Sequence, residues 1–464
     1  MNESRILKGE IYILKKNDVL KLEIVDNGIE FEGIAKYENT VVFVKDAIIG
    51  EEVLAKIIKV NKNYCIGKIE KIINKSKYRV EPFCEVFGKC GGCSAQNIEY
   101  DIQLLLKRQF VKNLLNKQKL EYGILENTIG QGMPYYYRNK VQYPLRQDSN
   151  GNTKIGFYLK RSHDVIENKC CYIQNRIIDM LAKELAEEMI GAGIAGYNEE
   201  EKVGDIKHLL IRRGYHTQEI MICIVATDPK IVNDTRIKKI INDIVKKNKN
   251  IKSVFININD SSTNEILGEK LYHMYGEEYI SDIIGKFKYY ISPKSFFQVN
   301  TLQAEVLYSV LANKLNLENG EIVFDLYSGV GSIGIFLSDK VKKVYGIEIE
   351  EEAVKMANLN LKLNNVKNAE YIAGSVEEKI EEFKKRNINP DIIVVDPPRK
   401  GLDEKSIKYI LNFKPKKIGY VSCNPATLSR DLKILSEKYN ILSITPVDMF
   451  PHTRTCGVCC GAET

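Results

Sequence analysis

The alternation of hydrophobic and polar positions changes character twice along the chain. Residues 10 to about 75 alternate over short segments broken by Asn27-Gly28 and by Gly50, which predicts a small antiparallel β-barrel. Residues 95 to about 285 mix helical and strand-like patterns, so we expect an α+β region there. From about residue 290, apolar runs of strand length alternate with helical stretches, which is typical of a βαβ arrangement around a parallel sheet.

Length and composition bear on the number of domains and on the cellular compartment. The chain has 464 residues, too many for one hydrophobic core, and we predict three domains at 8–75, 76–285 and 286–464. A charged fraction of 28% and a hydrophobic fraction of 44% are typical of soluble globular proteins. Because the N-terminus is polar and no apolar run is long enough to span a bilayer, we expect a cytoplasmic protein without membrane association. The net charge of +7 permits a polyanionic partner without requiring one.

Two segments of the barrel region resemble a known module. GIEFEGIAKYE and IIGEEVLAKIIKVNKNYCIGKIEKII are together similar to the TRAM domain, an OB-like RNA-binding barrel found on several RNA-modifying enzymes. An unrelated barrel with basic edges would fit the same pattern. The resemblance implies that this part of the chain contacts RNA.

Three cysteines lie close together in the segment CEVFGKCGGC, at Cys84, Cys90 and Cys93. Eleven cysteines in a reducing compartment indicate metal binding or catalysis and argue against a disulfide framework. The glycines let the backbone curl, so three thiols can converge on one ion or cluster, and a fourth ligand is expected at Cys171, with Cys170 as the alternative. The residues alone leave an iron–sulfur cluster and zinc open, and buried free thiols are the structural alternative. Two other cysteines lie within apolar strand patterns and are expected to be core residues: Cys65 and Cys223.

The segment YYYRNKVQYPL, residues 135–145, combines the consecutive Tyr135, Tyr136 and Tyr137 with Arg138, Lys140 and Gln142. Aromatic planes can stack on bases while the cations hold phosphate, as the recognition of single-stranded RNA requires. An edge strand that packs its tyrosines would have the same sequence pattern.

The C-terminal region contains a strand, a glycine-rich turn and a helix in EIVFDLYSGVGSIGIFLS. Asp325 ends the strand, and Gly329, Gly331 and Gly334 let the backbone approach a bound nucleoside near the amide donors of the helix start. Glu348 ends the next strand, where it can accept both hydroxyls of a ribose. This register fits either a dinucleotide or S-adenosylmethionine.

Two later strand ends decide between these cofactors. PDIIVVDPPRKGL places Asp396 and a rigid proline turn at the carboxyl edge of the sheet, a turn that resembles that of methyltransferases acting on bases. VSCNPATLSRD then places Cys423 between a strand and a helix at the same edge. A thiolate that adds to C6 of uracil makes C5 nucleophilic toward a methyl sulfonium, so we interpret Cys423 as that nucleophile.

The motifs FFQVN, DLYSGVGSIG, GIE, DPPRKGL and YVSCNPATLSRD, with the cysteine cluster, resemble the RNA uracil-C5 methyltransferases over nearly the whole chain. The likeness is closest to bacterial 23S ribosomal RNA members with a TRAM domain and a 4Fe–4S cluster. It implies an α/β protein with an N-terminal barrel, a central α+β domain and a Rossmann-like class I methyltransferase domain, acting as a monomer on ribosomal or transfer RNA. It also implies roles for nine residues: Gln298, Tyr327, Glu348 and Asp396 contact S-adenosylmethionine, Cys423 is the nucleophile, and Cys84, Cys90, Cys93 and Cys171 hold the cluster.

The last residues depart from this family. Its members follow FPHT with one residue, then HVE and an apolar strand, and the glutamate removes the C5 proton; here Gly457 stands in the place of that glutamate. Codons for residues 455 onward, when read one nucleotide later, can spell His-Val-Glu-Cys-Val-Val. We therefore hypothesise a frameshift, from a sequencing error or a recent inactivating indel, with genuine divergence as the alternative.

The sequence thus predicts methylation of uracil C5 in RNA, most specifically in 23S ribosomal RNA. The alternative is a catalytically impaired family member that still binds RNA, because the general base is missing. A DNA adenine methyltransferase is disfavoured, since attack through an exocyclic amine needs no nucleophilic cysteine.

Overall fold

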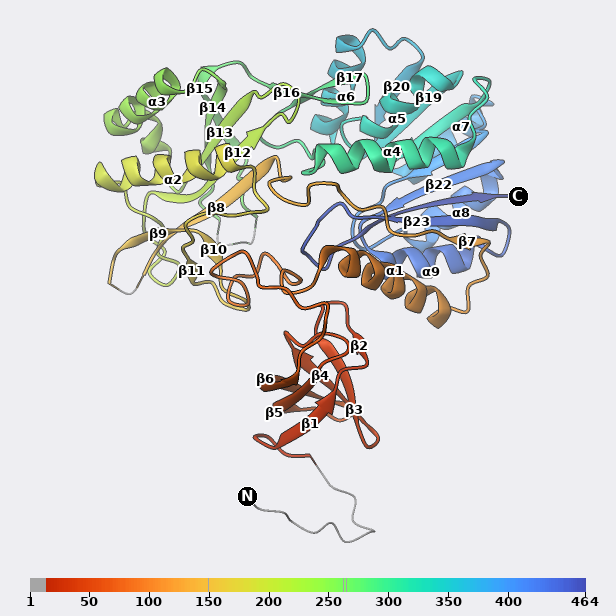
Figure 1. The fold of residues 1–464 in the computed structure, drawn as a ribbon. Coiled ribbons are helices and arrows are strands. Elements are labelled where there is room, and N and C mark those ends of the chain that lie inside the picture. The colour runs from red at the N-terminus through yellow and green to blue at the C-terminus, as the bar shows by residue number, and fades with distance from the viewer. Residues whose placement is uncertain (1–13, 149, 262, 264) are drawn as a thin grey trace.

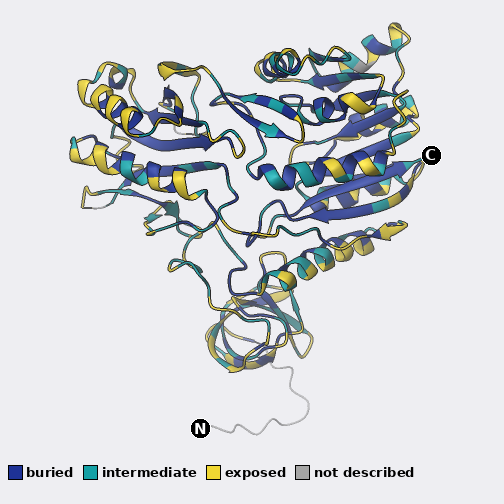
Figure 2. Cartoon of the chain, turned by 45° about the horizontal axis from the view of Figure 1, so that its top comes forward, coloured by how far each residue is buried: buried dark blue, intermediate teal, exposed yellow. Residues whose placement is uncertain are grey.

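The computed structural model describes residues 14–148, 150–261, 263 and 265–464. Figure 1 shows an N-terminal barrel and, above it, two larger lobes of sheets and helices that lie side by side. In Figure 2 the buried residues concentrate in the sheets, whereas the outward faces of the helices are exposed. Within these residue ranges, no helix is both long and apolar enough to cross a membrane.

The N-terminal lobe is a six-stranded sheet in the order β1-β5-β6-β4-β3-β2. Neighbouring strands are antiparallel apart from β4 and β6, which run parallel. Alternate side chains are buried along β1 and β5, as the sequence pattern predicts, and Cys65 is a core residue as expected. The strands are β1 Val19–Glu23, β2 Asp26–Asn27, β3 Gly33–Tyr37, β4 Thr40–Lys45, β5 Glu52–Val60 and β6 Tyr64–Asn74.

The middle lobe contains a second six-stranded sheet, in the order β15-β14-β13-β12-β8-β9. Helices α2 and α3 cover one face, where they share a core with Val141 and Tyr143 of β8. Cys223 is buried in β13, in agreement with its expected core role. The elements are β8 Lys140–Gln147, β9 Thr153–Ile155, β10 Phe157–Tyr158, β11 Val165–Ile166, α2 Arg176–Gly191, β12 Ile206–Arg213, β13 Ile220–Ala226, η1 Pro229–Asn233, α3 Thr235–Lys247, β14 Ile251–Ile258 and β15 Lys270–Gly276.

The C-terminal lobe is built on an eight-stranded sheet in the order β20-β19-β18-β21-β22-β24-β23-β7. Strands β20, β19, β18, β21 and β22 are parallel, and β24 pairs antiparallel with both β22 and β23. This is the Rossmann-like sheet that the βαβ pattern predicts. The elements are α4 Thr301–Leu315, β18 Ile322–Leu326, α5 Ser332–Leu337, η2 Ser338–Lys340, β19 Lys343–Glu348, α6 Glu351–Leu363, β20 Ala369–Ala373, α7 Val376–Lys385, β21 Ile392–Val395, α8 Glu404–Phe413, β22 Lys417–Ser422, α9 Pro425–Leu435, β23 Asn440–Val447 and β24 Gly457–Glu463.

Two early elements belong to this C-terminal lobe although they precede the middle lobe in the chain. Helix α1, Tyr100–Lys117, packs against α9 and β23, and strand β7, Ile124–Leu125, extends the sheet in parallel with β23. The hairpin of β16, Ile280–Ile284, and β17, Phe287–Ile291, packs against α4 and α6. The stretch 76–285 therefore contributes to two lobes, and the domain boundaries at 75 and 285 stay a prediction.

Candidate active site

Four side chains with reactive or charged groups lie at the carboxyl ends of neighbouring parallel strands. Asp325 lies in β18, Glu348 ends β19, Asp396 follows β21, and Cys423 follows β22. Because β19, β18, β21 and β22 are consecutive in the sheet, these groups share one edge. Ligands of open α/β sheets bind at this edge, as the sequence pattern predicts for the present chain.

The glycine turn after β18 is held by the two acidic side chains. The N–H of Gly329 donates to Glu348 Oε2 at 2.9 Å, and the N–H of Gly334 donates to Asp325 Oδ2 at 2.9 Å. Gly329 has a φ of 54°, and a Cβ at this position would meet nothing within 4 Å. The second oxygen of Asp325, Oδ1, is buried without a hydrogen-bond partner. An open backbone cradle beside acidic acceptors fits a nucleoside with ribose hydroxyls and a cationic group.

Two of these carboxyls have strongly perturbed pKa values. Burial raises the pKa of Asp396 to about 7, and burial together with the nearby charges of Asp396 and Glu348 raises the pKa of Asp325 to about 7. A cationic ligand at this edge would favour the ionised forms. Such perturbation is common where a site is arranged for binding or chemistry at the expense of stability.

Replacement of Asp396 by Asn is expected to stabilise the cofactor-free protein at pH 8. The folded pKa lies above the unfolded one, so stability from the protonated form is present at low pH and is lost as the pH rises through about 7. Asn lacks this titration, so the difference in the free energy of unfolding between Asp396→Asn and the wild type should shrink steadily toward pH 4. Urea unfolding of both proteins at pH 5 and pH 8 measures the two differences. Equal differences at both pH values would contradict the assignment.

Gln298 and Tyr327 approach the same edge from different elements. Gln298 precedes α4, and its backbone carbonyl accepts a hydrogen bond from Asn139 Nδ2 at 3.0 Å. Tyr327 adopts a φ of 62°, and its hydroxyl shares a 2.8 Å hydrogen bond with Ser406 Oγ. Tyr308 of α4 is a neighbour that sequence reasoning missed. It is buried and hydrogen-bonded to the Gln298 side chain and to Ser332 Oγ. Burial and the charge of Asp396 raise the pKa of its hydroxyl. A tyrosine inside an apolar helix pattern gives no sign of such a position.

Cys423 lies between β22 and α9, as the sequence pattern predicts for a thiol at a strand end. Its position is set by the helix start, because Asn424 caps α9 by accepting from the N–H of Ala426 and donates through Nδ2 to Arg399 O at 2.9 Å. Burial raises the pKa of the Cys423 thiol and Asp396 raises it further, whereas the hydrogen-bonding Arg399 guanidinium lowers it. Arg399 thus favours the thiolate, a contribution that the DPPR motif alone did not assign.

The C-terminal tail forms the strand that completes the sheet. Ser422 pairs with Val458 in the antiparallel register of β22 and β24, so the next position along each strand sets Cys423 opposite Gly457. A Cβ on Gly457 would meet Met449 Cγ at 2.7 Å. Cys456, Cys459 and Cys460 are buried free thiols. The tail therefore supplies the strand but places no carboxylate opposite Cys423.

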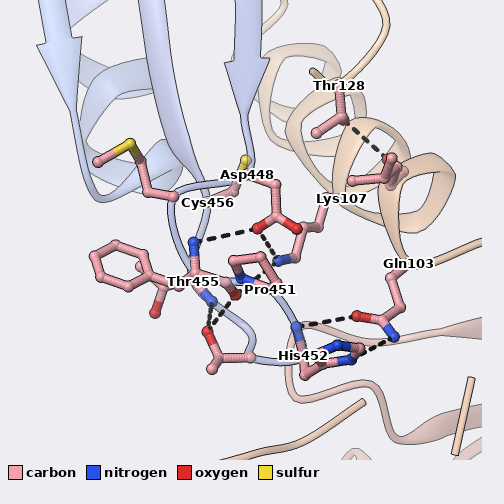
Figure 3. A network of polar contacts seen from close by, with 12 residues as sticks. Gln103, Lys107, Thr128, Asp448, Pro451, His452, Thr455 and Cys456 are labelled. Atoms are coloured by element: carbon pink, nitrogen blue, oxygen red, sulfur yellow. Dashed lines mark hydrogen bonds and ion pairs between the residues drawn. The ribbon is translucent and has the colours of Figure 1, made fainter. Parts of the chain in front are cut away.

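The turn between β23 and β24 is anchored to α1 by a buried polar network (Figure 3). Lys107 Nζ lies 2.5 Å from Asp448 Oδ1 and donates to Phe450 O at 3.2 Å, and Tyr100 Oη donates to Asp448 Oδ2 at 2.9 Å. His452, with a φ of 64°, contacts Gln103 through its backbone N–H and its ring. Burial lowers the pKa of His452 to about 4, so its ring is neutral at pH 7.

The four cysteines predicted as ligands line one cavity of about 240 Å³ in which Cys170 takes no part. Burial raises the pKa of Cys93 and Cys171 to about 12. The charge of Cys84 also raises the pKa of Cys90 and Cys93, and the charge of Cys93 raises that of Cys171. Three polar atoms on residues that line this cavity are buried without a partner: Arg138 Nε, Asn168 Oδ1 and Gln174 Oε1. No group of three or more His, Cys, Asp or Glu side chains in the described ranges is arranged to hold a metal ion. The structure thus brings the four predicted ligands to one cavity, and the 4Fe–4S assignment stays a prediction.

A larger groove of about 1050 Å³ runs between the barrel and the two other lobes. Phe43 and Tyr64 of the barrel form an edge-to-face pair at its rim, with ring centroids 5.5 Å apart. Arg454 bridges the groove by an ion pair with Glu30. Arg399, the neighbour of Cys423, also lines it, so the groove leads toward the active site. Its other basic side chains are Lys45, Arg138, Lys160 and Arg161.

Residues 135–147 do not form a simple edge strand. Tyr137 is buried and donates to Pro451 O at 3.0 Å, and Tyr135 stacks on His452 with ring centroids 5.2 Å apart. Strand β8 pairs with β12 along Lys140–Pro144 and with β9 along Leu145–Gln147. The tyrosines thus join the middle lobe to the C-terminal turn.

Comparisons with known proteins agree with this geometry. The tRNA (Uracil-5-)-methyltransferase family profile matches residues 100–462, and the TRAM domain profile matches residues 14–69. An uncharacterized RNA methyltransferase of Clostridium acetobutylicum is 45% identical over 448 residues, covering 95% of this chain and 96% of that protein. One of Clostridium tetani is 43% identical over 441 residues, with 95% of each chain covered.

A solved structure supports the fold. The Pyrococcus abyssi tRNA (uracil-54, C5)-methyltransferase in complex with S-adenosyl-L-homocysteine has a TM-score of 0.73 and 26% identity, and the match covers 96% of this chain and all of that one. The expected fold and TRAM barrel are confirmed, as is S-adenosylmethionine as cofactor. From these matches we conclude that the chain belongs to the tRNA (uracil-5-)-methyltransferase family and carries a TRAM domain at its N-terminal end.

Proposed function

We propose that the protein methylates C5 of a uridine in RNA through a covalent adduct on Cys423, with 23S ribosomal RNA as the substrate. The observation that carries this proposal is the placement of Cys423 beside Arg399 and Asp396 at the cofactor edge of the sheet. The ribosomal assignment rests on the likeness to members with a cysteine cluster, whereas the Pyrococcus relative is named for a transfer RNA position.

The chemistry follows from these residues. The Cys423 thiolate, favoured by Arg399, adds to C6 of uracil, and the electron pair of the C5–C6 bond moves to form an enolate. C5 then attacks the methyl group of S-adenosylmethionine, and the methyl–sulfur bond breaks to release S-adenosylhomocysteine. Removal of the C5 proton by a base re-forms the C5–C6 double bond and expels the thiolate from C6. Gln298, Tyr327, Glu348 and Asp396 are proposed to hold the cofactor during these steps.

We also propose that Cys84, Cys90, Cys93 and Cys171 hold a 4Fe–4S cluster. The cavity that the four cysteines share and the unpartnered donor Arg138 Nε on its wall support this assignment. Thiols with a raised pKa are neutral at pH 7, so binding of the cluster must release their protons. Such a cluster would supply either a structural link across the middle lobe or a one-electron redox centre.

Labelled S-adenosylmethionine with unmodified ribosomal or transfer RNA tests the function. The expected product on the RNA is 5-methyluridine linked to the protein or released from it, found by nucleoside analysis after complete digestion. Label in 5-methyluridine from transfer RNA alone would reassign the substrate. Bound RNA without any transferred label would favour the impaired RNA-binding alternative.

Replacement of Lys160 and Arg161 by Ala is expected to flatten the salt dependence of RNA binding. Both side chains are exposed and line the groove between the barrel and the active site. Each lost phosphate contact should reduce the slope of log K against log salt by about 0.7 for single-stranded RNA. Filter binding from 50 to 300 mM KCl measures the slope. Lys238→Ala/Lys239→Ala on the exposed face of α3 is the matched control, and an equal effect of both pairs would remove the groove from RNA binding.

A further inference from the structure

Two cations lie on the wall of the cysteine cavity: Arg138, just before strand β8, and Lys140, at its first position. Arg138, Lys140 and Gln142 occupy alternate positions, and all three line the cavity with the four cysteines. Val141 and Tyr143, which alternate with Lys140 and Gln142 along β8, lie in the core shared with α2. The two cations therefore lie in the cavity wall, where Arg138 also borders the groove and Lys140 also borders a second pocket of about 800 Å³.

Neither cation has an anionic partner among the residues that the structure describes. The Lys140 side chain makes no hydrogen bond or ion pair there, and its charged neighbours are Arg138 and Arg212, which repel it. Arg138 Nε is buried without a partner, although its guanidinium lies over the Phe450 ring. Arg212 Nη2 donates to the carbonyl oxygens of Ser295 and Pro293. Half-buried like charges without a counter-charge are unfavourable unless an anion completes the site.

The cysteine cavity offers that anion if the proposed cluster is present. Four thiolates around an oxidised four-iron cubane leave a net double negative charge, and net charge and hydrogen bonds to sulfur set the potential of such centres. We propose that Arg138 and Lys140 are the counter-charges of the cluster and hold its reduction potential up. This inference rests on the proposed 4Fe–4S assignment, and it places Lys140 outside the set of phosphate-binding residues.

The test uses the full chain, purified without oxygen, with Lys140→Gln and Arg138→Gln. Iron content should stay near that of the wild type, while the midpoint potential moves to more negative values, because a lost cation destabilises the more negative reduced state. Bleaching in air should accelerate for the same reason. Lys140→Arg should restore the potential, and Lys239→Gln on the exposed face of α3 should leave it unchanged. The RNA salt slope of Lys140→Gln should equal that of the wild type.

The outcomes separate this inference from the assignment beneath it. Wild-type protein without iron overturns the cluster and the counter-charge role together. If Lys140→Gln and Arg138→Gln keep their iron and have the midpoint potential of the wild type, the counter-charge role alone is overturned. A reduced RNA salt slope of Lys140→Gln with an unchanged midpoint potential overturns it as well. Iron loss in Lys140→Gln would contradict the expected retention of the cluster, and equal iron loss in Lys140→Arg would make Lys140 a purely structural residue.

Discussion

Incubated with S-adenosylmethionine and substrate RNA, the protein is expected to stop as a covalent methylated RNA–protein adduct. Addition of the Cys423 thiolate and capture of the methyl group need only the positioned thiol and cofactor. Release needs a base within hydrogen-bond reach of the C5 proton. Gly457 lies one position beyond the last β22–β24 pair, Ser422 with Val458, and has no side chain that could serve as this base. RNA should therefore migrate with the protein on a denaturing gel, and this band should be absent with Cys423→Ala.

Restoring the back-read motif should convert this adduct into turnover. The triple change Thr455→His, Cys456→Val, Gly457→Glu returns a carboxylate beside Cys423, and Met449 must shift to admit the new side chain. General-base catalysis is worth about 10²- to 10⁴-fold, so release of 5-methyluridine should accelerate by that order. Gly457→Gln in the same background is the matched control and should stay stalled. Rapid multiple turnover by the unrepaired chain would mean that another group or water takes the proton.

Sequencing of the 3′ end of the gene addresses the origin of the tail. An unambiguous in-frame read that matches residues 455–464 and ends in a stop codon would remove the sequencing-error version of the frameshift hypothesis. Because the tail pairs with both β22 and β23, the edge that carries Cys423 keeps its neighbouring strand.

Replacement of Cys90 by Ser is expected to abolish cluster binding and to destabilise the middle lobe. Protein prepared anaerobically should be brown, with absorbance near 400 nm (an order-of-magnitude value for thiolate-to-iron charge transfer), and the variant should be colourless. Without the cluster, raised-pKa thiols and two uncompensated cations face an empty cavity, so thermal unfolding should begin several degrees lower. Iron analysis and calorimetry measure both effects. Cys170→Ser is the matched control, because Cys170 does not line the cavity. If Cys90→Ser keeps the full iron content, Cys90 is not a ligand.

Periodicity and turn residues predicted the architecture because they act locally. The strands of the barrel and the strand–turn–helix around Asp325 follow from hydrophobic alternation and glycine position. The shared edge of Glu348, Asp396 and Cys423 was predictable for the same reason, since carboxyl ends of parallel strands must coincide.

The parts that sequence reasoning missed depend on contacts between distant segments. The hydroxyl of Tyr308 reaches Gln298 and Ser332 only after α4 packs on the sheet. Arg138 and Lys140 had the composition of an RNA-binding segment, and only the fold brings them to the wall of the cysteine cavity. The pairing of Lys107 with Asp448 joins residues at opposite ends of the family-matched region, and local pattern carries no sign of it.

The placement of α1 and β7 has a consequence for synthesis on the ribosome. Both elements emerge early, yet their partners α9 and β23 are among the last segments to be translated. Val111 and Leu115 of α1, which belong to the core of the C-terminal lobe, must therefore remain exposed or be held by a chaperone until the chain is nearly finished. The middle lobe, whose strands are contiguous, can fold in the meantime. Nascent-chain arrest after residue 300 should accordingly yield a protected middle lobe and a protease-sensitive α1.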